Sequence, residues 1–244
     1  MARRTKQEAQ ETRNRILDTA EHVFHERGVS RTSLAEIAVA AGLTRGAIYW
    51  HFRNQADLFD AMMSRDTLPM EEMAHRAGAA VHADPLGFVR DCALNVLHRT
   101  ANDPQCRRVF EIMCHKCEYI DEMTQLKARH IECRAECLAE MERGFANAII
   151  KRQVSPDCDP RRAALGLSAL VDGLITDWLL DPSFHSLARD AEPIVDMFLS
   201  GLGARPRPAR PVVSAAVAPT EFTPAAVAPT GRRRNKQSAA KPAD

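Results

Sequence analysis

A chain of 244 residues, of which 45% are hydrophobic, is long and apolar enough to bury a sizeable core. Its longest apolar stretch, residues 165–180, is interrupted by Ser168 and two aspartates, which excludes the run of about 18 uninterrupted apolar residues that a membrane span needs. The net charge is +1, and seven cysteines occur in a chain without a recognisable signal peptide. This combination excludes a secreted disulfide framework and predicts a cytoplasmic protein with reduced thiols.

Positive charge gathers near the two ends of the chain. Residues 205–244 hold eight Lys and Arg but two Asp and Glu, which leaves the rest of the chain with an excess of acids. Basic clusters at Arg3, Arg4 and Lys6 and at residues 232–236 are suited to neutralising phosphates from a flexible arm. We therefore expect any contact with DNA to be local.

Apolar residues recur at helical spacing almost throughout, without a sustained period-2 run, so we predict an all-α fold. The first helix opens at a capping box formed by Thr5 and Glu8 and stops at Gly28, which can adopt a left-handed conformation. Its apolar face carries Ile16, Leu17, Ala20, Val23 and Phe24.

Two short helices follow the first one. Ser33 and Glu36 form a second capping box, and Gly42 closes the helix that it opens. Thr44 caps the next helix, which ends near Phe52.

Asp-Pro pairs mark the starts of later helices or turns, because Asp accepts orphan amide bonds and Pro supplies the φ of the first helical turn. These pairs begin at Asp84, Asp103, Asp159 and Asp181. The predicted later helices cover residues 54–75, 85–101, 104–118, 122–152, 160–180 and 188–203.

From residue 205 the composition changes to Pro, Ala, Val and Thr, which predicts a disordered tail over residues 205–244. We expect two folded regions before the tail. The first contains three helices over residues 1–53, and the second is a helical bundle over residues 54–204.

The most specific signal is a predicted helix-turn-helix over residues 33–52. Leu34, Ile37 and Ala38 face inward on its first helix, and Ile48 anchors the second. The remaining side chains of the second helix combine hydrogen-bond donors with aromatic rings and include no acid. They are Thr44, Arg45, Gly46, Tyr49, Trp50 and His51.

This segment resembles the DNA-binding domain of the TetR family. The residues that carry the resemblance are Ile37, Ala38, Gly42, Gly46, Tyr49, His51 and Phe52. Residues 3–6, 46–52 and 115–118 further resemble the AcrR/TtgR-like repressors of multidrug efflux pumps.

The resemblance implies that the helix after Thr44 enters the major groove of DNA. An arginine such as Arg45 can also offer two parallel donors to guanine, which discriminates by about 1–3 kcal/mol. Relatives usually have a lysine where this chain has Gln55, so one phosphate contact is left to Arg53. The expected DNA-binding residues are Arg3, Arg4, Lys6, Thr32, Ser33, Thr44, Arg45, Gly46, Tyr49, Trp50 and His51.

The helices after residue 54 contain more apolar positions than a DNA-reading head needs, and the resemblance implies a small apolar effector within them. Soft Met and Cys side chains would tolerate varied ligand shapes, although each candidate can also simply pack the core. Asp172 needs either a ligand donor or a polar partner on another helix. The candidates are Cys92, Val96, Phe110, Met113, Cys114, Cys137, Met141, Ser168, Val171, Asp172 and Thr176.

The last two helices resemble those that pair with their copies in a family dimer. Two joined reading heads would bind a near-palindromic operator in double-stranded DNA at the nucleoid, and the ligand would favour the head spacing that DNA rejects. We expect neither a cofactor nor a metal. The dimer candidates are Leu165, Leu170, Leu174, Trp178, Ile194, Phe198 and Leu199.

Alternative functions rest on the cysteines and on the basic tail. Cys114 with Cys117, and Cys133 with Cys137, have spacings that place each pair on one helix face, as in a zinc or thiol sensor. The tail would instead suit a protein that bends DNA with little sequence preference. An enzyme is not expected, because the chain has no Gly-rich phosphate loop, zinc-protease motif or nucleophile elbow.

Overall fold

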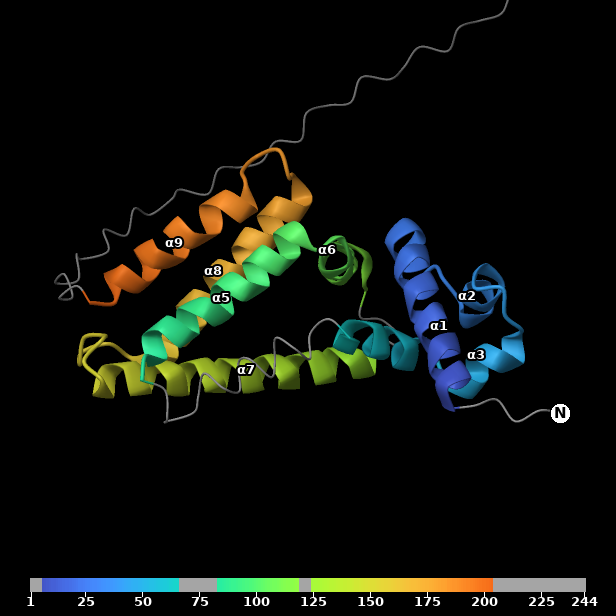
Figure 1. The fold of residues 1–244 in the computed structure, drawn as a ribbon, viewed down its shortest axis with the longest axis horizontal. Helices are drawn as coiled ribbons and strands as arrows, with labels where there is room; N and C mark the ends of the chain where they lie inside the picture. Colours follow the sequence, from blue (N-terminus) through green and yellow to red (C-terminus); the bar gives the residue numbers. More distant parts are fainter. Residues whose placement is uncertain (1–5, 66–82, 119–123, 204–244) are drawn as a thin grey trace, which may run out of the picture. The chain divides into compact units, whose positions relative to one another are not determined.

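The computed structural model describes residues 6–65, 83–118 and 124–203, and these are helical without a strand, which confirms the all-α fold (Figure 1). Residues 55–65 are also helical. The elements are α1 (Lys6–Arg27), α2 (Leu34–Ala40), α3 (Arg45–His51), α5 (Pro85–Asn102), α6 (Pro104–Glu111), the π-helix η1 (Ile112–Lys116), α7 (Thr124–Ile150), α8 (Pro160–Leu180) and α9 (Leu187–Gly201).

The predicted helix caps determine most of these boundaries. The Ser33 side chain accepts from the Glu36 amide while the Glu36 side chain accepts from the Ser33 amide, so this capping box is confirmed. Gly28 and Gly42 have φ of +84° and +66°, the left-handed conformation expected after a helix. Asp84, Asp103 and Asp159 each accept amide hydrogen bonds at the start of α5, α6 and α8.

Several predictions fall on residues outside the described ranges. They are the capping residue Thr5, the DNA-binding residues Arg3 and Arg4, the helix beyond residue 65, the helix start at residue 122, and the tail over residues 205–244. The predicted helix over residues 104–118 is interrupted, because α6 ends at Glu111 and the chain continues as the wider π-helix η1.

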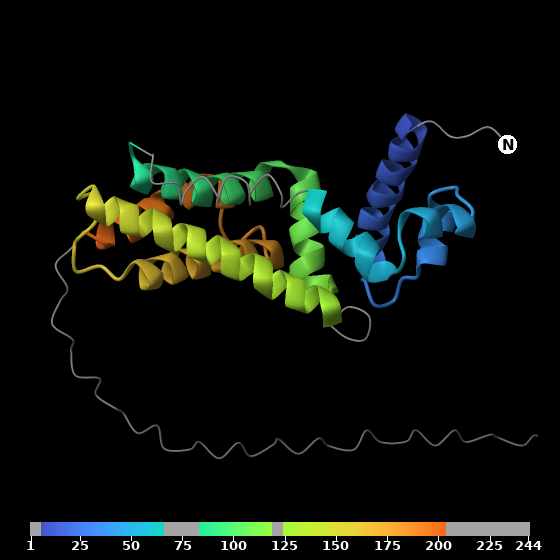
Figure 2. The same ribbon diagram turned by 90° about the horizontal axis from the view of Figure 1, so that it is seen from below.

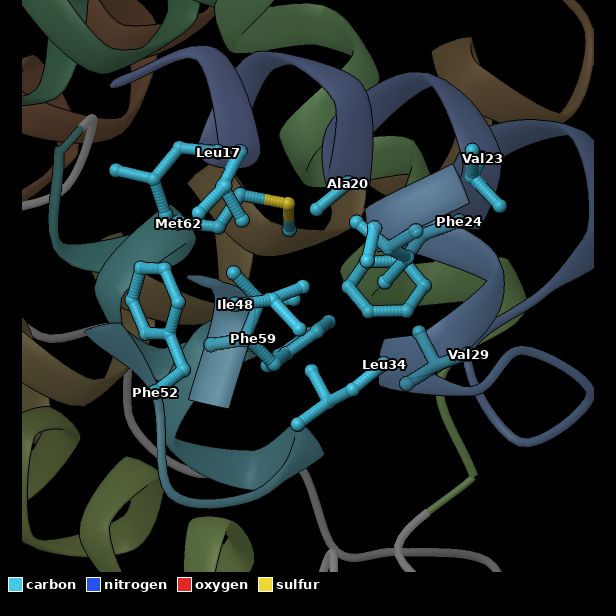
Figure 3. Close-up of a cluster of buried hydrophobic side chains, with 14 of the residues drawn as sticks. Leu17, Ala20, Val23, Phe24, Val29, Leu34, Ile48, Phe52, Phe59 and Met62 are labelled. Carbon is cyan, nitrogen blue, oxygen red and sulfur yellow. The ribbon is translucent and has the colours of Figure 1, made fainter. Parts of the chain in front are cut away.

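The head, which we define as residues 6–65, has its own buried core (Figure 3). Side chains from α1, α2, α3 and residues 55–65 point into a common space, where Phe24 and Ile48 are fully buried. Ile112, from η1, is also fully buried in this cluster. The core of the head therefore extends past residue 53 and includes one residue from a distant part of the chain.

We predict that Ile112→Ala lowers the free energy of unfolding by about 2–5 kcal/mol, because it leaves a cavity in a closed core. Urea unfolding followed by circular dichroism measures this loss. Ile150→Ala is the matched control, since Ile150 is 76% exposed, and it should change stability by less than about 0.5 kcal/mol. Equal effects of the two substitutions would contradict the placement of Ile112.

The body, which we define as α5, α7, α8 and α9, has a second core. Leu97, Phe145 and Leu167 are fully buried at its centre. Helix α8 is long and apolar enough by composition to cross a membrane, but it packs here against α5, α7 and α9. Helices α6 and η1, which we call the linking segment, lie between α1 and the body in both views (Figures 1 and 2).

Candidate nucleic-acid interface

Helix α3 presents an outward face that carries donors and aromatic rings. Thr44 caps it by accepting the Ala47 amide at 3.2 Å, and Ile48 is its one buried residue. Tyr49 and Trp50 are 44% and 73% exposed, which is unusual for large rings. The helix is anchored by its inner face, so the outer side chains are available to a partner.

The outward side chains of α3 pack against one another in two pairs. The Arg45 guanidinium lies over the Tyr49 ring, 5.5 Å from its centroid, and the Trp50 and His51 rings meet edge to face at 4.6 Å. A stacked guanidinium keeps its donor fork oriented. The arrangement therefore presents an oriented cation beside aromatic rings, with no acid on the helix.

Two of the predicted DNA contacts, Thr32 and Ser33, lie near the start of α2. Thr32 is 4% exposed and its hydroxyl donates to the Gly28 carbonyl, so we correct its assignment: its side chain belongs to the framework and not to the DNA-binding set. Ser33 remains exposed, but its hydroxyl is bonded to Glu36, and these bonds lower the pKa of the Glu36 carboxyl. The Ser33 amide is also bonded to Glu36, so a phosphate contact here falls to the amides of the first residues of α2.

Gln55 has a structural task that the sequence did not reveal. Its amide nitrogen donates to the carbonyls of Val29 and Thr32, which braces the loop before α2. Arg53 pairs with Asp57, but its side chain is 90% exposed and can therefore turn toward a phosphate. Lys6 is the first residue of α1, whereas Arg3 and Arg4 lie outside the described residues.

The effector candidates come from five neighbouring elements. Cys92 and Val96 lie on α5, Phe110 on α6, and the rest on η1, α7 and α8. Most of them are half-buried, and several pack against the body core. Burial raises the pKa of the Cys92 thiol to about 12, so this cysteine acts as a neutral apolar group.

Three of the candidates meet in a polar group at the junction of η1, α7 and α8. The Cys114 thiol interacts with Thr176 and with the charge of Asp172, while Arg134 pairs with Asp172 at 3.2 Å. His130 of α7 also interacts with Asp172, and burial lowers its pKa. Asp172 thus has a polar partner on another helix, and the sequence did not identify Arg134 or His130.

The Asp172 side chain is partly exposed to solvent, yet the surrounding protein desolvates its carboxyl. About half of its side chain is exposed, yet burial by the surrounding protein raises the pKa of its carboxyl, against the lowering effect of Arg134 and His130. Met113, Cys137, Met141, Ser168 and Val171 are half-buried on the adjoining elements.

We predict that Asp172→Asn raises the melting temperature at pH 7. A carboxyl whose folded pKa is raised costs stability above that pKa, and the cost disappears as pH falls toward the unfolded value of about 3.9. The gain should therefore shrink on acidification. Scanning calorimetry from neutral to acid pH measures it.

Asp196→Asn is the control with the opposite sign. Hydrogen bonds from Arg90 lower the pKa of Asp196, so its charge stabilises the fold above its unfolded pKa and this stability is lost in acid. Its substitution should lower the melting temperature at pH 7. A gain for Asp172→Asn that is independent of pH would contradict the assigned cause.

None of the seven cysteines forms a disulfide bond in the described part of the chain. Burial raises the pKa of Cys117 to about 11 and also raises that of Cys114, so the surroundings of these two cysteines disfavour the thiolate form. Within the described ranges, no group of three or more His, Cys, Asp or Glu side chains is placed to hold a metal ion. A protonated thiol is a poor metal ligand and a slow nucleophile.

The dimer candidates divide into two groups. Trp178 and Leu199 are 6% and 8% exposed in the body core, where the Trp178 ring stacks on Arg107 at 4.4 Å. These two residues cannot supply outward surface, and we correct their assignment. Leu165 is 53% exposed, while Leu170, Leu174, Ile194 and Phe198 are half-buried.

An outward apolar face is nevertheless present on α8 and α9. Met197 is 70% exposed, and Ala169 and Gly173 are exposed on the same side of α8 as Leu165. The Phe198 ring packs against Gly166, where an added Cβ would lie only 3.0 Å from the ring. Gly166 therefore lets α9 lie close to α8, beside Leu165.

Comparison with known proteins assigns the family. Residues 16–62 match the bacterial regulatory proteins of the tetR family, and residues 84–203 match the C-terminal region of MAATS-type transcriptional repressors. The regulator TtgR of Pseudomonas putida is 41% identical over 206 residues, which cover 84% of this chain and 98% of TtgR. The chain belongs to the tetR family of transcriptional regulators.

Solved structures of tetR-family repressors share this fold along their full length. NalD of Pseudomonas aeruginosa, the secondary repressor of the MexAB-OprM multidrug efflux pump, is 36% identical with a TM-score of 0.74, covering 81% of this chain and 98% of NalD. The SmeT–triclosan complex is 31% identical with a TM-score of 0.73, covering 82% and 100%. SmeT is the repressor of the Stenotrophomonas maltophilia pump SmeDEF, so the similar proteins include the efflux repressors that the motifs predicted.

Proposed function

We propose that this tetR-family protein is a dimeric repressor of a multidrug efflux operon that releases its operator on binding a small apolar compound. The DNA-binding part of this proposal rests on the outward face of α3. An acid-free helix with an oriented arginine fits the negatively charged major groove, where a guanidinium reads guanine through two hydrogen bonds. Such a protein acts in the cytoplasm, at the nucleoid.

The α3 residues proposed to contact DNA are Thr44, Arg45, Gly46, Tyr49, Trp50 and His51. Ser33 and the basic residues Arg3, Arg4 and Lys6 complete the set, with Arg53 as an added phosphate contact. Phosphate contacts position the helix, and Arg45 supplies the base preference.

Dimerisation is supported by the apolar face of α8 and α9. Large exposed apolar side chains can mark a contact surface, and Leu165 on α8 and Met197 on α9 lack cover in the single chain. Small residues at positions 169 and 173 would let two copies of α8 approach closely. A two-fold interface of this kind presents the same patch twice.

An apolar effector is supported by the half-buried Met, Cys and Phe side chains on α5, α6, η1 and α7, the elements that adjoin α8 and its Asp172. The similar repressor SmeT binds triclosan, a chlorinated phenol, in its solved complex. Here Asp172, Arg134 and Thr176 would orient a polar group on such a ligand, while Phe110 and Met141 would contact its rings.

The proposal is tested with the full chain and a duplex selected by it from random sequence. Fluorescence anisotropy should show tight binding to a near-palindromic duplex and weak binding to a shuffled one. Added triclosan, or another apolar phenol that raises the melting temperature of the protein, should release the duplex. Binding that is insensitive to sequence would favour a DNA-bending protein, and the proposal would fail.

A further inference from the structure

The linking segment contacts both the head and the body. Its body side carries Arg107, which stacks on Trp178, and Phe110, which packs on the body core. Its head side carries Arg108 and Ile112, which reach α1 and the head core. Any change in the position of this segment on α1 therefore changes the position of the head.

A buried carboxylate lies where this segment meets α1. The Glu21 side chain is 2% exposed, and it is the one charged side chain among the buried residues of α1. Its Oε1 accepts from Arg108 Nε at 2.7 Å, and its Oε2 accepts from Arg65 Nη2 at 3.0 Å. Arg65 also donates to Asp18 at 2.6 Å. Glu21 thus joins three elements that are distant in sequence: α1, residues 55–65 and α6.

Stability alone does not account for an ionic contact at this position. Removing a carboxylate from water is costly, and well-packed apolar residues often stabilise an interior as well as an ion pair does. Directional charged hydrogen bonds instead restrict the relative position of the elements that carry them, because two guanidinium groups can bond one carboxylate in few arrangements. An apolar contact between two helices tolerates sliding, whereas this contact does not.

Other contacts already close the junction. Ile112 fills the head core, the Val29 amide donates to the Lys116 carbonyl at 3.0 Å, and the Lys116 ammonium donates to the His25 carbonyl at the end of α1. His25 Nε2 also lies 3.0 Å from Glu111 Oε2. These contacts keep the linking segment on α1, and the buried ion cluster adds directional bonds between α1 and α6.

We propose that Glu21 is a positioning residue for operator binding. By tying Arg108 and Arg65 to α1, it holds the head at the position relative to the body that a DNA-bound dimer requires. This inference rests on the proposed function, since it assigns no DNA contact to Glu21. Loss of the cluster would leave the fold intact and spread the head over several positions, of which only some fit the operator.

The test compares two double variants of the full chain. Glu21→Met with Arg108→Met replaces the α1–α6 ion pair by apolar side chains and leaves Arg65 paired with Asp18. Arg90→Met with Asp196→Met is the matched control, because it removes an ion pair between α5 and α9 inside the body. Melting temperature and affinity for the duplex selected by the wild-type protein are measured for both.

We expect the Glu21 variant to melt at or above the wild-type temperature and to bind the duplex at least about tenfold more weakly. The slope of affinity against salt should stay at the wild-type value, because no phosphate contact is lost. The control should bind within about twofold of wild type, because its head is not released.

Unchanged or tighter binding by a folded Glu21 variant overturns the proposal. If the double variant does not fold, Arg108→Gln decides, since Glu21 then keeps Arg65 and the expected loss of affinity is about threefold or more. Failure of the wild-type protein to select any duplex would instead refute the proposed function. The two failures are thus distinguishable.

Discussion

Arg45→Ala should reduce operator affinity more than any other single substitution on the surface of the head. The side chain is exposed at the start of α3 and lies over Tyr49. Loss of a bidentate guanine contact costs about 1–3 kcal/mol, and a dimer loses two, so the expected decrease is about 30-fold to more than 10,000-fold. Gel-shift titration measures it, with gel filtration to show that the dimer is intact.

The base preference separates a reading arginine from one that only touches phosphate. With Arg45→Ala, selection from random sequence should lose its preference at one position of each half-site. Arg53→Ala should weaken all duplexes alike and lower the salt slope by about one. Arg162→Ala, an 87% exposed arginine of the body, is the control that should change neither. Full affinity in Arg45→Ala would show that α3 is not the reading helix.

Leu165→Glu should separate the dimer and, with it, operator binding. The side chain is half exposed in the single chain, so the monomer should still fold. In a two-fold interface each substitution places two carboxylates in the contact, and an unpaired buried charge costs several kcal/mol. Sedimentation at micromolar concentration should show a monomer, and affinity for the full operator should fall by orders of magnitude.

Ile131→Glu is the matched control for this prediction. Ile131 is 59% exposed on α7 and does not belong to the apolar face defined on α8 and α9, so the same change of side chain should leave the dimer and operator binding unaltered. A Leu165→Glu protein that remains dimeric would place the interface elsewhere. Near-ultraviolet circular dichroism verifies that both variants are folded.

Local chemistry accounts for the parts of the fold that the sequence predicted correctly. Capping by Ser33, Thr44 and Asp159, together with left-handed glycines, depends on residues within four positions of each other, and the helix ends follow from it. The helix-turn-helix motif is similarly local. It was therefore readable from residues 33–52 and led to the correct family.

Packing between distant segments explains the errors. Apolar residues occur on more than one side of α8, so its sequence does not tell which of them face the body core. The structure places Trp178 inside and Leu165 outside. Thr32 was predicted to contact DNA, but the turn at Gly28 places the Gly28 carbonyl where it accepts a hydrogen bond from the Thr32 hydroxyl.

The sequence alone determined most of the described helices, the caps at Ser33, Thr44 and Asp159, and the outward chemistry of α3, because each depends on side chains less than two turns apart. Only the tertiary structure decided what lies between the head and the body. Glu21 and Arg108 are 87 residues apart, and neither stands in a recognisable motif. A buried ion pair becomes visible only when the chain brings its two halves together, since burial itself is a property of the folded protein.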